Sequence, residues 1–149
     1  MKDLQWKDEY TVGIPAIDLQ HRRIFDCISD TVLGPSADDR LRAEANMIKL
    51  LGLLQQHFAL EESMLRTFSY PELEQHIEEH RQFHADVHGL AQESLRVKGR
   101  VPREAMKLAY KWLTEHIMTT DRHYVRFFAD PTLLRRRRRG VRNSGAISR

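Results

Sequence analysis

Apolar residues recur along this chain with the three-to-four-residue period of an α-helix, in four separate stretches. Gly34-Pro35-Ser36, Tyr70-Pro71 and the pair Gly99 and Pro102 interrupt this period and separate the stretches. The predicted helices run from Asp18, as a cap, to Val32, from about Ala37 to Leu65, from Tyr70-Pro71 to about Val97, and from Pro102 to Asp130. Because the connections are short, the pattern predicts an all-α, up-down-up-down antiparallel four-helix bundle.

The first 17 residues lack a helical period. Gly13 and Pro15 break them up, whereas Trp6, Tyr10 and Ile17 offer apolar contacts. We expect residues 1–17 to form an ordered arm that lies on the bundle. With 149 residues, of which 41% are hydrophobic and 30% charged, the chain is typical of one folded domain.

Charge divides the chain at Asp130. Seven Arg and no acidic residue follow that position. Residues 1–130 therefore hold 17 of the 24 basic residues and all 21 acidic residues of the chain. We therefore predict a mildly acidic bundle domain over residues 1–130 and a disordered, Arg-rich tail over residues 131–149. The run Arg135-Arg136-Arg137-Arg138-Arg139 is either a solvated extension or a contact for anionic lipid or nucleic acid. The absence of aromatic residues within it disfavours sequence-specific nucleic-acid recognition.

The cellular setting follows from two further features. No apolar run is long enough to cross a bilayer, and the first residues do not resemble a signal peptide. The single Cys27 cannot form an internal disulfide. These features predict a cytoplasmic protein in which Cys27 is a quiet structural residue on a different helix face from His21.

Two pairs of polar residues interrupt the apolar faces of the second and third helices. His57 and Glu61 are four residues apart, as are His76 and His80, and Pro71 places the two pairs on different helices. A spacing of four stacks two side chains on one helix face. Inward-facing imidazoles and carboxylates on antiparallel helices are typical of a metal site in a bundle.

The remaining helices supply further candidate ligands: His21 on the first, and His116 and Asp121 on the fourth. Burial of unpaired carboxylates costs several kcal/mol per ion, and because a typical domain is stable by only about 5–15 kcal/mol in total, such a cost must be offset. A bound cation offsets that cost and accepts the imidazole lone pairs as well. The pattern therefore predicts a metal centre that draws ligands from all four helices.

Five imidazoles and two carboxylates are too many for one tetrahedral zinc ion. Two metal ions that share Glu61 and Asp121 as bridges leave three imidazoles for one ion and two for the other. A set of imidazole and carboxylate without thiolate favours iron, with zinc or manganese as alternatives. The five-residue offset of Asp121 from His116 turns it by roughly 140° on a regular helix. Either Asp121 reaches the metals from another side, or the helix is distorted there, as by a π-bulge.

These residues resemble the hemerythrin family, and within it the single-domain bacteriohemerythrins. The resemblance extends from Trp6 to about Phe128, and all seven ligand positions hold the residue types of the family. It rests on Val12-Gly13-Ile14-Pro15-Ala16-Ile17-Asp18-Leu19-Gln20-His21, His57-Phe58-Ala59-Leu60-Glu61-Glu62, Tyr70-Pro71, His76, His80, Trp112-Leu113-Thr114-Glu115-His116-Ile117 and Asp121.

The resemblance implies a non-haem di-iron centre bridged by Glu61, Asp121 and an oxo or hydroxo group. One iron would take His76, His80 and His116. The other would take His21 and His57 and keep one position vacant for reversible dioxygen binding, for storage, delivery or sensing. The alternatives are a di-iron enzyme or detoxification protein that acts on peroxide or nitric oxide, an iron-handling protein, and an interaction module with a structural metal.

Two features favour a carrier over an enzyme. No evident acid or base stands beside the vacancy, and no His follows a Glu at the Glu-x-x-His spacing of ferritin-like oxidases. We expect an apolar wall to keep water from the oxygen pocket, formed by Phe25, Phe58, Trp112 and Ile117.

Four other polar residues near the predicted ligands are expected to lie outside the ligand set. Glu62 lies about 100° from Glu61 around the helix, which favours solvent or a hydrogen bond at the edge of the site. His84 and His88 drift away from the core face with each turn, and His123 belongs at the end of the bundle.

Overall fold

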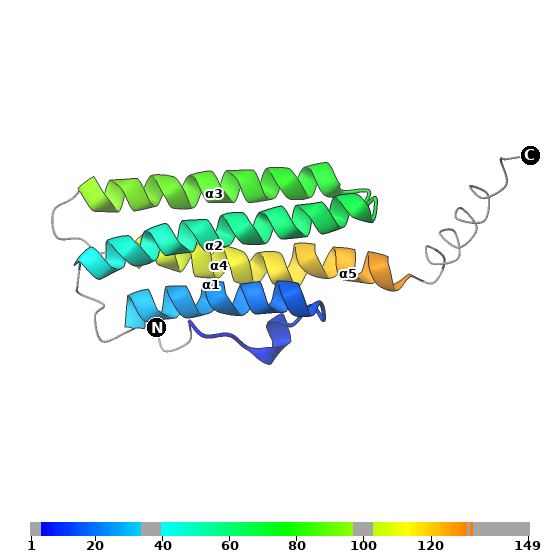
Figure 1. Ribbon diagram of the computed structural model, residues 1–149, viewed down its shortest axis with the longest axis horizontal. Helices are drawn as coiled ribbons and strands as arrows, with labels where there is room; N and C mark the ends of the chain where they lie inside the picture. Colours follow the sequence, from blue (N-terminus) through cyan, green and yellow to red (C-terminus); the bar gives the residue numbers. More distant parts are fainter. Residues whose placement is uncertain (1–3, 34–39, 97–102, 131, 133–149) are drawn as a thin grey trace, which may run out of the picture.

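Four long helices lie side by side in the computed structural model, and the N-terminal segment lies along α1 (Figure 1). The structure describes residues 4–33, 40–96, 103–130 and 132. The long helices are α1 (Pro15–Leu33), α2 (Arg40–Thr67), α3 (Leu73–Arg96) and α4 (Arg103–His116). A π-helical segment, η2 (Ile117–Asp121), continues α4 into α5 (Arg122–Ala129). A short 3-10 helix, η1 (Asp8–Tyr10), lies in the arm.

The helices pack as a ring in which α1 contacts α2 and α4, and α3 contacts α2 and α4. Figure 1 shows that successive helices run in opposite directions. Together with these contacts, this confirms the predicted antiparallel four-helix bundle. None of the helices in the described ranges combines the length and the hydropathy required to span a bilayer.

Two helix starts differ from the prediction. α1 begins at Pro15, a residue whose fixed φ suits the first helical position, and Asp18 lies within the first turn. Asp18 instead accepts hydrogen bonds from the backbone N–H groups of Val12 (2.8 Å) and Gly13 (3.0 Å), so it holds the arm against the helix. The positive φ of Gly13, +83°, lets the chain turn there. α3 begins at Leu73, after a turn that contains Pro71.

Several predicted features lie outside the described residues. They are the start of the second helix at Ala37, the breaks at Gly34-Pro35-Ser36 and at Gly99 and Pro102, and the Arg-rich run of the tail. The division into residues 1–130 and 131–149, and the lipid or nucleic-acid contact through Arg135–Arg139, remain predictions.

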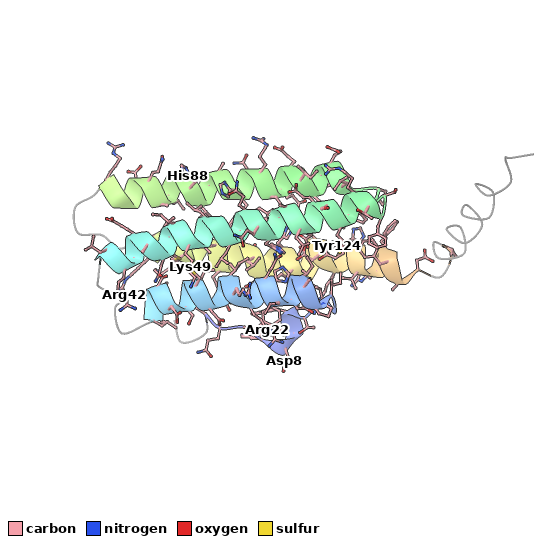
Figure 2. The ribbon with its side chains drawn as sticks, viewed as in Figure 1. Asp8, Arg22, Arg42, Lys49, His88 and Tyr124 are labelled. Atoms are coloured by element: carbon pink, nitrogen blue, oxygen red, sulfur yellow. The ribbon has the colours of Figure 1, made fainter. Side chains whose placement is uncertain are left out.

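Among the residues that the structure describes, the core consists of two apolar clusters. The larger one fills most of the bundle and includes Phe25, Leu54 and Leu113, each fully buried. The smaller one contains Leu65, Tyr70 and Tyr124. Figure 2 shows Tyr124 near the end of the bundle where α2 joins α3. The ligand candidates on α2 and α3 contact Phe58 of the larger cluster and Tyr124 of the smaller one, so the polar centre described below lies between the two clusters.

Candidate metal centre

All seven ligand candidates converge in the interior of the bundle. Each side chain belongs to a residue that is at most 4% exposed: His21, His57, Glu61, His76, His80, His116 and Asp121. Their donor atoms form two groups in which all atoms lie within 4.8 Å of one another, and each group could hold a metal ion. The first group contains Glu61, His76, His80 and His116, and the second contains His21, His57, Glu61 and Asp121.

The π-helical segment explains how Asp121 joins His116. A π-turn closes hydrogen bonds from residue i to i+5, so it takes in one residue more than a turn of α-helix. That extra residue rotates Asp121 back toward the bundle axis, and its Oδ1 lies 3.1 Å from Nε2 of His116. Of the two explanations left open by the five-residue spacing, the structure therefore shows the distorted helix.

The first group is the more crowded of the two. Nε2 of His76 and Nε2 of His80 lie 3.0 and 3.2 Å from Oε2 of Glu61. The Nε2 atoms of His80 and His116 are 3.1 Å apart. All three imidazoles thus direct the same nitrogen to one point, which is the arrangement needed to share a cation.

The second group shares Oε2 of Glu61 with the first and faces the other oxygen of Asp121. Nε2 of His21 lies 3.1 Å from Nε2 of His57 and 3.5 Å from Oδ2 of Asp121. Nε2 of His57 lies 3.7 Å from Oε2 of Glu61. Asp121 therefore turns Oδ1 toward His116 in the first group and Oδ2 toward His21 in the second, as a bridging carboxylate does.

Burial governs the protonation of the second group. It lowers the pKa of His21 to about 4 and that of His57 to about 3, against the partial opposition of Glu61. Burial and then the charge of Glu61 raise the pKa of Asp121 to about 6. Neutral imidazoles keep the lone pairs that a metal ion requires.

The first group is governed more by its carboxylates. Burial disfavours a charged His116, but Asp121, Glu79 and Glu61 outweigh it and raise its pKa to about 9. Burial likewise opposes the charge of Glu61, yet the surrounding imidazoles hold its pKa well below the usual value. A cation at this point would displace the proton of His116 and compensate both carboxylates.

The donor set fits a pair of cations. Among the described residues, both oxygens of Asp121 are buried beside imidazoles, including those of His116 and His21, and their burial costs several kcal/mol unless a positive charge compensates it. Five imidazole nitrogens and two carboxylates without thiolate suit iron, zinc or manganese.

We expect the metal-free protein to lose stability as the pH falls from about 6.5 to 5. His21 and His57 bind protons on unfolding in this range because their pKa values are low only in the folded state. Asp121 takes up a proton in the folded state below about pH 6, which offsets one of the two protons that His21 and His57 bind on unfolding. His80, whose pKa burial also lowers, adds to the loss, whereas His116, whose pKa is raised to about 9, opposes it only near pH 6.5. Near pH 5.5 the net slope is therefore about 1.4 kcal/mol per pH unit or more. Urea unfolding of chelator-treated protein measures it, and a flat profile would contradict the burial of neutral imidazoles.

Sequence reasoning missed Tyr124. Its hydroxyl donates a 2.5 Å hydrogen bond to Oε1 of Glu61, and its ring lies 5.8 Å from that of His76. Such a short bond to a carboxylate is a strong one. Tyr124 follows Asp121 by three residues and so shares its helix face, which was the available signal.

The predicted oxygen-pocket residues lie in different places around the centre. The ring of Phe58 stacks on that of His80 with a centroid separation of 3.9 Å, and its centroid lies 5.6 Å from that of the His57 ring. Phe58 is therefore next to both groups. Trp112 stacks on His116 at 4.2 Å, on the side of the first group. Phe25 packs among aromatic rings of the arm and α4, and Ile117 is fully buried at the start of η2. Their role as an oxygen pocket remains a prediction.

The residues expected outside the ligand set do lie outside the two groups. His84 is partly exposed and His88 exposed, and the exposed His123 contacts Glu72 at 2.9 Å. Glu62 accepts a hydrogen bond from Nδ1 of His80 at 2.9 Å. Burial raises the pKa of the Cys27 thiol to about 11, which agrees with a quiet structural cysteine.

Comparison with known proteins gives a consistent result. A family model described as "Hemerythrin HHE cation binding domain" matches residues 12–128. The chain is 32% identical to a myohemerythrin of Theromyzon tessulatum over 120 residues, and this alignment covers 80% of this chain and 89% of the relative. It is 27% identical over 123 residues to a bacteriohemerythrin of Stenotrophomonas maltophilia, with coverage of 81% and 78%. A bacteriohemerythrin of Clostridium acetobutylicum is 28% identical over 130 residues, with coverage of 80% and 97%.

Proposed function

This chain belongs to the hemerythrin family, and from that premise we propose that it binds dioxygen reversibly at a non-haem di-iron centre. His76, His80 and His116 would hold one iron, and His21 and His57 the other. Glu61 and Asp121 would bridge them together with an oxo or hydroxo group. When bound, the iron pair supplies the electrons that dioxygen accepts and that it returns on release.

One observation carries this proposal: Glu61 belongs to both groups and Asp121 faces both, but the groups differ in their number of imidazoles. The first offers three imidazoles and the second only two. If Asp121 serves both ions, through Oδ1 on the side of His116 and Oδ2 on the side of His21, an ion in the second group would have one protein ligand fewer and would keep room for a small external ligand. A structural site, in contrast, closes its coordination with protein donors.

The surroundings of the second group favour binding over further chemistry. His21 lies beneath Trp6, whose ring is 6.3 Å away at an angle of 26°, and beside the fully buried Phe25 of the same helix. Exclusion of water by such side chains protects a reactive ligand from protons. Ile117 and Phe58 would extend this apolar wall.

Reduced, iron-loaded protein provides the test. We expect a visible charge-transfer band to appear in air, to vanish under argon and to return over several cycles. Zinc-loaded protein is the matched control, since zinc has no redox chemistry and should stay colourless.

Other outcomes would favour other functions. Irreversible oxidation in the first cycle, accompanied by turnover of added peroxide, would contradict the proposal and favour the alternative of a di-iron enzyme. Storage, delivery and sensing all begin with the same reversible binding step, so each is compatible with a positive result.

A further inference from the structure

The outward nitrogens of the five imidazoles have unequal partners. In the first group, Nδ1 of His80 faces Oε1 of Glu62 at 2.9 Å, and Nδ1 of His116 faces Oε2 of Glu79 at 3.4 Å. Each pair places a carboxylate behind an imidazole whose Nε2 points to the centre. Such a partner fixes the imidazole tautomer and makes the inward nitrogen a stronger donor. Nδ1 of His76, the third imidazole of the first group, is buried without a hydrogen-bond partner among the described residues.

Glu79 is held in this position from two further sides. Its Oε1 accepts a hydrogen bond from Gln75, one turn earlier on α3, at 3.1 Å. Its Oε2 accepts one from the hydroxyl of Thr120, in the π-helical segment, also at 3.1 Å. The π-turn therefore positions Asp121 and also ties down the carboxylate behind His116. A carboxylate fixed in this way keeps its orientation toward the imidazole.

The second group has no such carboxylate. Nδ1 of His57 faces the amide oxygen of Gln20 at 3.3 Å, and Nδ1 of His21 is buried without a hydrogen-bond partner in the described part of the chain. An amide oxygen is a neutral acceptor and polarises an imidazole less than a carboxylate does. Two of the three imidazoles in the first group thus have a carboxylate behind them, and neither imidazole of the second group has one, so the groups differ in ligand basicity as well as in their number of imidazoles.

We propose that Glu62 and Glu79 are positioning residues that make the first group the tighter of two unequal metal positions, so that the second group fills last and exchanges its ion first. The proposal rests on the two-metal centre of the proposed function but not on dioxygen. A partner of this kind contributes about 10-fold to 100-fold in metal affinity. The second position should then accept an ion different from that in the first.

Calorimetric titration of the metal-free protein with Zn²⁺, in a competing chelator, provides the test. We expect two steps of unequal affinity. Glu62→Gln and Glu79→Gln convert each carboxylate into the kind of partner that Gln20 already is. Each should weaken the first step by about 10-fold or more. Conversely, Gln20→Glu places a carboxylate behind His57 and should strengthen the second step by a similar factor.

Glu78→Gln is the matched control. Glu78 adjoins Glu79 on α3 and carries the same charge, but it is exposed and paired with Arg81 at 2.5 Å. It should leave both steps unchanged. Helical content and the unfolding midpoint of each metal-free variant show whether folding is preserved, and Gln20→Glu tests the proposal through a gain rather than a loss.

Each contrary outcome has a distinct meaning. Uptake of two ions with equal affinity, or carboxylate variants that titrate like Glu78→Gln, would overturn this proposal and leave the proposed function standing. Saturation with a single ion would overturn both. Two unequal steps in a protein whose iron form does not bind dioxygen reversibly would overturn the proposed function alone.

Discussion

His76→Ala should leave the protein without its metal pair. Nε2 of His76 lies 3.0 Å from Oε2 of Glu61 and 3.9 Å from Oδ1 of Asp121, so this imidazole faces both shared carboxylates. Its removal takes one ligand from the first group and leaves two buried carboxylates with less compensation. Metal content after dialysis should fall from two ions per chain to below one.

The same substitution should lower stability. An ion that binds only the folded state stabilises it by about 4 kcal/mol at a thousand times its Kd, and this contribution disappears with the ion. Thermal unfolding with and without added iron measures the loss. His88→Ala is the control because His88 lies on the same helix with an exposed side chain. Full retention of two ions by His76→Ala would refute the ligand assignment.

Phe25→Ala should destabilise the protein by about 3–5 kcal/mol, the usual range when a buried aromatic ring is truncated. Phe25 is fully buried, and its ring packs against those of Trp6 (5.6 Å), Tyr10 (5.2 Å) and Tyr110 (5.4 Å). It therefore joins the arm to α1 and α4, and its loss opens a cavity that these three elements share.

Urea unfolding measures this effect. Leu41→Ala provides the control, since Leu41 is 77% exposed on α2 and its truncation should change the free energy of unfolding by about 0.5 kcal/mol or less. A loss below about 1 kcal/mol for Phe25→Ala would show that the cavity collapses and that the arm is held by other contacts, such as those of Asp18.

The bundle was predictable because its signal repeats. Apolar positions recur through four stretches, and polar pairs at a spacing of four mark the inward face of α2 and α3, so helices and candidate ligands follow from one periodicity. The helix starts were less predictable. Asp18 has the chemistry of a cap, but in the folded chain its carboxylate serves the arm, a choice that depends on tertiary contacts.

The π-helical segment shows where local reasoning ends. The spacing of His116 and Asp121 conflicts with a regular helix, yet two geometries resolve that conflict and only the packing of α4 chooses between them. Tyr124 and Glu79 were missed for a related reason. The helical period places Tyr124 on the face of Asp121, but the roles of Tyr124 and Glu79 depend on partners on other helices, Glu61 and Thr120, which that period does not identify.

Because the ligands are distributed unequally among the helices, the two ions would hold different sets of helices together. The first group joins α2, α3 and α4, whereas His21 brings α1 only into the second. An ion in the second position is thus a cross-link that fastens α1, together with the arm lying on it, to α2 and to the π-helical continuation of α4. Amide hydrogen exchange along α1 should accelerate when that ion departs, while protection in α3 persists as long as its own ion stays.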